Sequence, residues 1–150
     1  AELPASANRV AAENARAAAK RDDAAGAEQM LATSTRAQPN TSWWHFEMAQ
    51  KLIQLAYDVP REGRSQIIPE IVSRSLYHLT TAESLTSDPR QRASIKAFAG
   101  RIQERYLGDH AAAIASFRAA AALSPDHPQA MASAERLQRT ADAMAAIARK

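Results

Sequence analysis

Histidine can act as a general acid, a general base or a metal ligand, and this sequence has four histidines, at positions 45, 78, 110 and 127. His45, Phe46 and Glu47 form an H-x-E motif, which zinc deaminases use to hold the metal and move a proton. Those enzymes also need cysteine ligands, and this chain contains no cysteine. His110 and His127 stand beside expected helix starts, where we predict solvated or capping roles. None of the histidines has a recognised metal-ligand spacing, so we expect no metal site.

The other residue patterns of catalysis are also missing from the sequence. Each of the four glycines is isolated, so the chain has no glycine-rich loop to cradle a phosphate. There is no G-x-S-x-G turn to present a nucleophilic serine. Asp22 and Asp23 are the only adjacent pair of carboxylates, and a helix start explains them. We therefore expect no catalytic residue, no cofactor and no enzymatic activity.

The composition indicates an all-α protein of one domain. A chain of 150 residues has the usual length of a single domain and can bury a core. Alanine, the best helix former, is abundant, and aromatic residues make up only 5% of the chain. No run of residues alternates between apolar and polar as a half-buried strand would.

The net charge and the first residues of the chain bear on its binding partners and on its cellular location. The net charge of +3 and the pI near 9.6 are mildly basic, which alone gives weak grounds for nucleic-acid binding. No apolar run approaches the roughly 18 residues of a transmembrane helix. The first residues, AELPAS, lack an initiator methionine, which fits a mature product cut after an Ala-type signal site, although a trimmed chain would begin in the same way. We expect a periplasmic or otherwise exported protein, with the cytoplasm as the alternative.

One spacing of apolar residues recurs three times along the chain. It consists of a small residue, a large apolar residue four positions later, a small residue three further on, and a last residue after three more. The three copies are Ala27, Leu31, Ser34, Ala37; Ser75, Leu79, Ala82, Leu85; and Ala113, Phe117, Ala120, Leu123. These offsets predict one face of a helix that packs closely against a neighbouring helix.

Breaks in the sequence place a partner helix before each copy. The aspartates at 22–23, the segment 39–42, Asp88 with Pro89, and Gly108 with Asp109 are all typical of helix ends and N-caps. They predict helix pairs over about 8–39, 42–87 and 89–125, a loop at 58–66 inside the second pair, and a terminal capping helix at 128–149. The helix near 43–57 is apolar on two faces, which indicates a position between other helices.

The segment at 107–125, LGDHAAAIASFRAAAALSP, resembles the second helix of a tetratricopeptide repeat (TPR). The resemblance implies antiparallel helix pairs stacked as a short α-solenoid of about seven helices with a C-terminal capping helix. In that family, the first helices of successive pairs line a concave groove that holds peptides or partner helices. The residues that this implies for partner binding are Arg9, Arg16, Trp43, Phe46, Gln50, Lys96 and Gln103.

The resemblance also implies a class of ligand. Family members that grip a C-terminal carboxylate carry a lysine where Lys96 stands, but they carry an asparagine where this chain has Gly100. A groove with basic ends and an aromatic middle favours an amphipathic helix or an extended peptide with acidic flanks. We therefore expect a non-catalytic adaptor or scaffold, and the family suggests a bacterial envelope complex.

Two other functions remain open from the sequence. The segment 89–107 carries five basic residues against one acidic residue, so a basic nucleic-acid-binding helical domain is one alternative. The other is a structural domain whose exposed apolar residues pair with a second copy of the chain.

Overall fold

The computed structural model describes residues 5–60 and 66–149, and within these ranges it contains seven α-helices, one π-helical turn and no strand. The predicted all-α fold is confirmed. None of the helices in these ranges is both long enough and apolar enough to span a bilayer.

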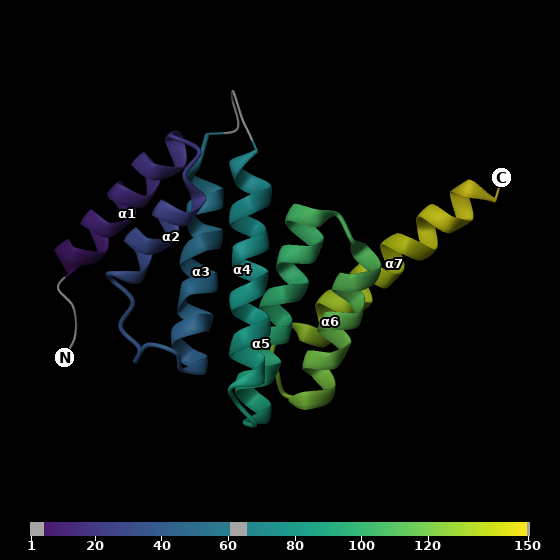
Figure 1. Cartoon of the computed structure of the whole chain (residues 1–150). Coiled ribbons are helices and arrows are strands. Elements are labelled where there is room, and N and C mark those ends of the chain that lie inside the picture. The colour runs from purple at the N-terminus through teal and green to yellow at the C-terminus, as the bar shows by residue number, and fades with distance from the viewer. Residues whose placement is uncertain (1–4, 61–65, 150) are drawn as a thin grey trace. The chain divides into compact units, whose positions relative to one another are not determined.

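Contacts between residues divide the chain into two compact units, residues 1–85 and residues 86–150. The first unit contains α1 (Ala5–Lys20), α2 (Ala24–Ala32), α3 (Ser42–Asp58) and α4 (Ile67–Ser84) (Figure 1). The second contains α5 (Pro89–Ile102), the π-helical turn η1 (Gln103–Leu107), α6 (His110–Leu123) and α7 (Ala130–Ala148).

Short polar side chains start the helices, as the sequence predicts. Asp23 accepts a hydrogen bond from the Gly26 amide (2.8 Å) and begins α2, and Thr41 accepts one from the Trp44 amide (3.1 Å) and begins α3. Each of these caps satisfies an amide that has no partner within its own helix.

Asp88 and Asp109 begin α5 and α6 in the same way. Gly108 precedes Asp109 with a positive φ of 62°, a conformation that costs glycine little and other residues more.

The helices of the first unit form two hairpins. In one α1 packs against α2, and in the other α3 packs against α4, whereas α2 touches α3 and α4 much less extensively. Two buried serines tie α3 to α4, because Ser42 Oγ donates to the Ala82 carbonyl (2.7 Å) and Ser75 Oγ donates to the Ala49 carbonyl (2.9 Å). The contact with α4 is therefore the most extensive that α3 makes with another helix.

The first three positions of the recurring spacing are buried, although Ser34 lies beyond the end of α2, and of the three residues at the fourth position Leu123 packs against the core. Leu85 is 50% exposed, and Ala37 and Leu123 are only partly buried. The fourth residue falls at or beyond the end of its helix, so the expected single face does not extend that far.

The first copy shows why. Helix α2 ends at Ala32, before Ser34 and Ala37, because Thr33, Ser34 and Thr35 turn their hydroxyls back onto the carbonyls of Met30 and Leu31. These bonds compete with continuation of the helix.

The second unit is built around Phe117 of α6. Its ring is 2% exposed and lies against Gly100 of α5, where any added Cβ would be 3.0 Å from the ring. The helix α7 contributes Ala134 and Leu137 to the same core. Arg136 holds α7 to η1 through two hydrogen bonds with the Glu104 carboxylate (2.8 and 2.9 Å).

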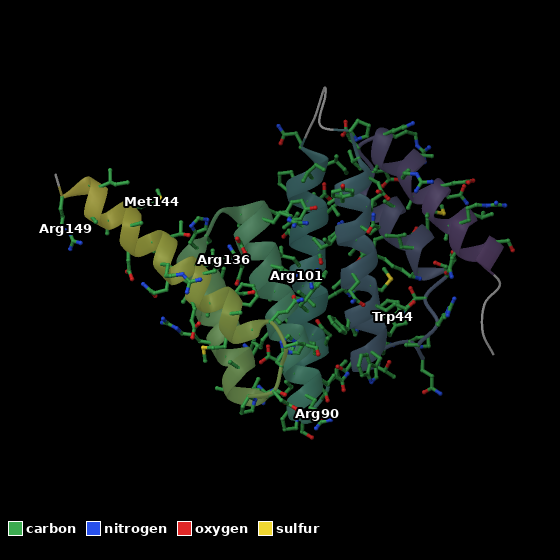
Figure 2. The ribbon with its side chains drawn as sticks, turned by 180° about the vertical axis from the view of Figure 1, so that it is seen from behind. Trp44, Arg90, Arg101, Arg136, Met144 and Arg149 are labelled. Carbon is green, nitrogen blue, oxygen red and sulfur yellow. The ribbon has the colours of Figure 1, made fainter. Side chains whose placement is uncertain are left out.

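The predicted capping helix packs along only half of its length. Ala130, Ala134 and Leu137 are buried, whereas Met144 and Ile147 are 61% and 71% exposed. Figure 2 shows Met144 and Arg149 on the part of α7 that extends beyond α6. The predicted loop at 58–66 begins where α3 ends, but its residues 61–65 lie outside the described residues.

Candidate functional site

A cavity of about 360 Å³ lies in the first unit between α1, the end of α2 and α3. Its apolar floor is formed by Leu31 and Leu55, which are buried, and by Ala12, which is partly buried. The polar wall carries three cations, two carboxylates and further hydrogen-bonding side chains. These are Arg16, Arg36, Lys51, Glu47, Asp58, Asn8, Ser34 and Gln54. We name this site the α1–α3 groove.

Lys51 is the best-anchored cation of the groove. Its Nζ donates to the Ser34 carbonyl (2.7 Å) and to Ser34 Oγ (2.9 Å), and it pairs with Glu47 Oε2 at 3.1 Å. Glu47 also accepts from the Arg36 backbone amide (3.1 Å). Lys51 therefore fixes the segment after α2 against α3, and its charge is already opposed by a carboxylate.

The two guanidinium groups are held less firmly. Arg16 Nη1 is 3.8 Å from Asp58 Oδ2, and both side chains are partly exposed, so this pair contributes little to stability. Oriented to satisfy both halves of its amide, Asn8 donates to the Ser34 carbonyl (3.1 Å) and accepts from Arg36 Nη2 (3.2 Å). Arg36 thus meets a neutral group here, and it is available to an anion.

A stripe of exposed side chains runs along α3 beside the groove. Trp43, Gln50 and Tyr57 occupy every seventh position, which places them on one face of the helix. Trp43 is 56% exposed and Tyr57 is 70% exposed. The groove and this stripe together form a surface that is apolar in parts and charged at its edges.

The structure brings some of the predicted binding residues together and separates others. Arg16 lines the groove, and Trp43 and Gln50 are exposed on α3. Phe46 is 8% exposed and packs against Trp43, with ring centroids 6.0 Å apart, so it supports Trp43 from below the surface.

The remaining three predicted residues lie elsewhere. Arg9 is exposed on α1, where it lies 4.0 Å from Glu13, and it does not line the cavity. Lys96 and Gln103 belong to the second unit and are partly buried, and Gln103 accepts a hydrogen bond from Ser116 Oγ (2.7 Å).

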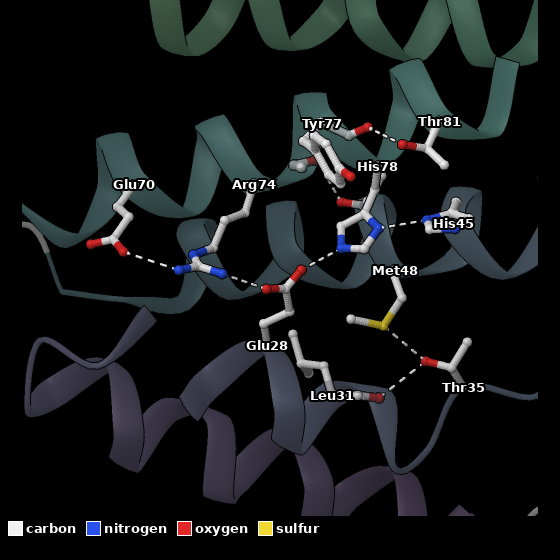
Figure 3. A network of polar contacts seen from close by, with 12 residues as sticks. Glu28, Leu31, Thr35, His45, Met48, Glu70, Arg74, Tyr77, His78 and Thr81 are labelled. Carbon is white, nitrogen blue, oxygen red and sulfur yellow. Dashed lines mark hydrogen bonds and ion pairs between the residues drawn. The ribbon is translucent and has the colours of Figure 1, made fainter. Parts of the chain in front are cut away.

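A second polar cluster is buried in the first unit and joins three helices (Figure 3). His45 of α3 and His78 of α4 meet through their Nδ1 atoms at 2.8 Å. The other ring nitrogen of His78 contacts the Glu28 carboxylate of α2. Glu28 also pairs with Arg74 Nη1 (2.6 Å), and Arg74 reaches Glu70 (3.4 Å). We name His45, His78 and Glu28 the histidine cluster.

The surroundings of the cluster shift two of its pKa values downward. Burial lowers the pKa of His45, and the nearby charge of His78 acts in the same direction. The hydrogen bond from His78 lowers the pKa of Glu28, with Arg74 adding to the effect against the opposing influence of burial. Together these shifts favour an ionised Glu28 and a neutral His45.

Ser42 of α3 and Ser75 of α4 each stand three positions before a histidine of the cluster. The hydroxyls of Ser42 and Ser75 donate to backbone carbonyls. Among the described residues, no group of three or more histidine, aspartate or glutamate side chains is arranged to hold a metal ion. The H-x-E motif therefore contributes His45 to the histidine cluster and Glu47 to the groove.

Sequence reasoning missed most of both sites. Asn8, Arg36 and Lys51 have no motif, and only the packing of α1 on α3 brings them together. His110 and His127, for which we predicted solvated or capping roles, are not members of the histidine cluster. Its members are distant in sequence, since His45 and His78 are 33 positions apart and Glu28 and His78 are 50 positions apart. Two histidines on the apolar faces of predicted helices were the one available signal.

Comparison with known proteins gives no match to a family model, to a curated protein or to a solved structure. The resemblance to tetratricopeptide repeats thus stays a prediction from the sequence.

Proposed function

We propose that the first unit is a non-catalytic binding module that takes a peptide in the α1–α3 groove. The observation that carries this proposal is the cavity itself, which is lined by the first helices of two successive hairpins. Its volume of about 360 Å³ suits a few side chains of a peptide. The exposed stripe of Trp43, Gln50 and Tyr57 extends the contact along α3.

The charges of the groove favour a peptide that carries an acidic residue next to an apolar one. Three cations face two carboxylates, so the groove has an excess of one positive charge. Lys51 is already paired with Glu47, whereas Arg16 is weakly paired and Arg36 meets an amide. Arginine binds a carboxylate through two parallel hydrogen bonds, and the floor of Leu31 and Leu55 suits an apolar side chain beside it.

A peptide-binding module of this kind would act as an adaptor or scaffold, which is the role that the resemblance to tetratricopeptide repeats implies. Nucleic-acid binding by the basic helix α5 is the competing function. Salt distinguishes the two, because nucleic-acid affinity falls steeply with salt concentration, whereas peptide binding in a mixed apolar and ionic groove depends on salt less.

The test is selection of a random peptide library on the immobilised chain, followed by calorimetry with the enriched peptides. We expect enriched sequences to pair an aspartate or glutamate with a large apolar residue. The double variant Arg16→Glu/Arg36→Glu should weaken binding at least about tenfold, because each lost charged hydrogen bond is worth about 1.5–3 kcal/mol.

A matched control reverses two exposed arginines, Arg139 of α7 and Arg149 directly after that helix, in the variant Arg139→Glu/Arg149→Glu. It makes the same change in net charge outside the groove, so it should bind nearly as well as the wild type. Equal weakening by both variants would reduce the effect to overall charge and overturn the proposed site.

A further inference from the structure

The contact between His45 and His78 limits how many protons the pair can hold. Two ring nitrogens at 2.8 Å form a hydrogen bond, which needs one proton between them. The other nitrogen of His78 carries a proton as well, because the Glu28 carboxylate can only accept. The tautomer of His78 is therefore set by its partners.

Three protonation states satisfy this geometry, and a fourth breaks it. Both rings can be neutral, with His45 donating from Nδ1, or either ring can be an imidazolium that donates from Nδ1 to the neutral ring of the other. If both rings are imidazolium, two N–H groups and two positive charges face each other across 2.8 Å. The contact therefore accommodates one charge but not two.

The charged groups around the pair come from α2 and α4. Glu28 faces His78 from α2, and Arg74 of α4 faces Glu28, with Glu70 behind it. On α1, Arg9 pairs with Glu13 and Arg16 with Asp58. Glu28 stabilises the first positive charge on the pair, but Arg74 already opposes the charge of Glu28. A second positive charge thus has no carboxylate of its own in the cluster.

We expect α2 to be the helix that moves when both histidines are charged. Ser42 and Ser75 tie α3 to α4 through buried hydrogen bonds, and these two helices share an extensive contact. By contrast, α2 contacts α3 and α4 much less extensively, is joined to α4 through Glu28, and is followed by a segment that Lys51 holds on α3. Moving α2 admits water to the rings and leaves the α3–α4 hairpin intact.

We propose that the histidine cluster is a proton-operated clasp that holds the α1–α2 hairpin on the α3–α4 hairpin and opens when both histidines become charged. The groove is lined by both hairpins, so opening the clasp also changes the groove. The clasp itself does not depend on what the groove binds.

The direction of the pH effect follows from the lowered pKa of His45. Below about pH 6.5, the ordinary pKa of an imidazole, His45 binds fewer protons in the closed form than in the unfolded chain, so the closed form loses stability as the pH falls below that value. The lowered pKa of Glu28 has the same sign, and its contribution is lost only at more acidic pH.

The test measures the distance between the two hairpins as a function of pH. The chain has no cysteine, so Ala17→Cys on α1 and Ser73→Cys on α4, both exposed positions, can carry a unique pair of spin labels. We expect one distance at about pH 8 and a growing population with a longer distance towards about pH 5, with its midpoint below the ordinary pKa of histidine.

Two variants and a control assign the transition. His45→Gln or His78→Gln leaves a side chain that can hydrogen-bond but cannot become charged, so either should make the distance independent of pH. His110→Gln removes a histidine of the second unit and should keep the transition. A constant distance in the wild type, or an unchanged transition in both glutamine variants of the pair, would overturn the clasp.

Fluorescence covers the case in which the glutamine variants fail to fold. Trp44 lies edge-on to both rings, with centroids 4.9 Å from His45 and 5.7 Å from His78. Trp43→Phe leaves Trp44 as the only tryptophan, and an imidazolium quenches an adjacent indole more strongly than a neutral imidazole does. Quenching with the same midpoint as the distance change supports the clasp, and different midpoints would overturn it.

Discussion

The contact between Gly100 and Phe117 shows how one missing side chain permits the packing of the second unit. A Cβ at position 100 would lie 3.0 Å from the Phe117 ring, and that ring is 2% exposed. A core this full leaves the ring no room to retreat. Gly100 therefore has a packing role. From the sequence alone, we could say only that a glycine stands where carboxylate-binding members of the resembled family carry an asparagine.

We predict that Gly100→Ala destabilises the chain by about 1 kcal/mol. Overpacking typically costs about 1–3 kcal/mol, which exceeds the roughly 1 kcal/mol that alanine gains over glycine in a helix. Urea unfolding followed by far-UV circular dichroism measures the change. Adding Phe117→Leu removes the ring atoms that the new Cβ would meet and should reduce the penalty of the alanine in a double-mutant cycle. A stabilising Gly100→Ala would show that the ring can move.

At the scale of single residues, the sequence predicted well which side chains are buried and poorly which neighbours they contact. The first three residues of each copy of the recurring spacing are buried, and eight of these nine lie on a helix, whose buried face follows from local offsets. Trp43 and Phe46 are close in sequence and on the same helix, yet one is exposed and the other is buried. Their fates differ because burial depends on which neighbouring helix covers each side, and local spacing does not contain that information.

Helix starts are the elements that the sequence specified most directly. Asp23, Thr41, Asp88 and Asp109 each accept a hydrogen bond from an amide of the first turn. Helix ends were harder to predict, since α2 ends at Ala32 through the hydroxyls of three consecutive serine and threonine residues. The capping rule is local, whereas the end of α2 reflects a competition between helix and side-chain bonds.

The cap of α6 gives a prediction at this scale. Asp109 Oδ1 accepts from the Ala112 amide at 3.0 Å, so Asp109→Ala should lower the free energy of unfolding by about 1 kcal/mol. Asp109→Asn keeps the acceptor and should lose much less, as thermal and urea unfolding would measure. Equal losses in both variants would mean that the charge near the helix start matters and the hydrogen bond does not.

At the scale of the whole molecule, helix pairs were predictable but the sites were not. Each pair is formed by helices adjacent in sequence, and short connections favour such neighbours. The α1–α3 groove joins residues from position 8 to position 58, and the histidine cluster joins positions 28, 45 and 78. Both depend on the packing of one hairpin on the next, for which the sequence offered only the family resemblance.

We propose that the α1–α3 groove binds an acidic, partly apolar peptide. The most direct measurement is an amide nuclear magnetic resonance titration of the isotopically labelled chain with a library-selected peptide. We predict that shifts concentrate at Arg16, Arg36 and Lys51 and along α3, and that they are lost in Arg16→Glu/Arg36→Glu. Shifts confined to the basic helix α5, or saturable binding that leaves the groove amides unchanged, would contradict the account.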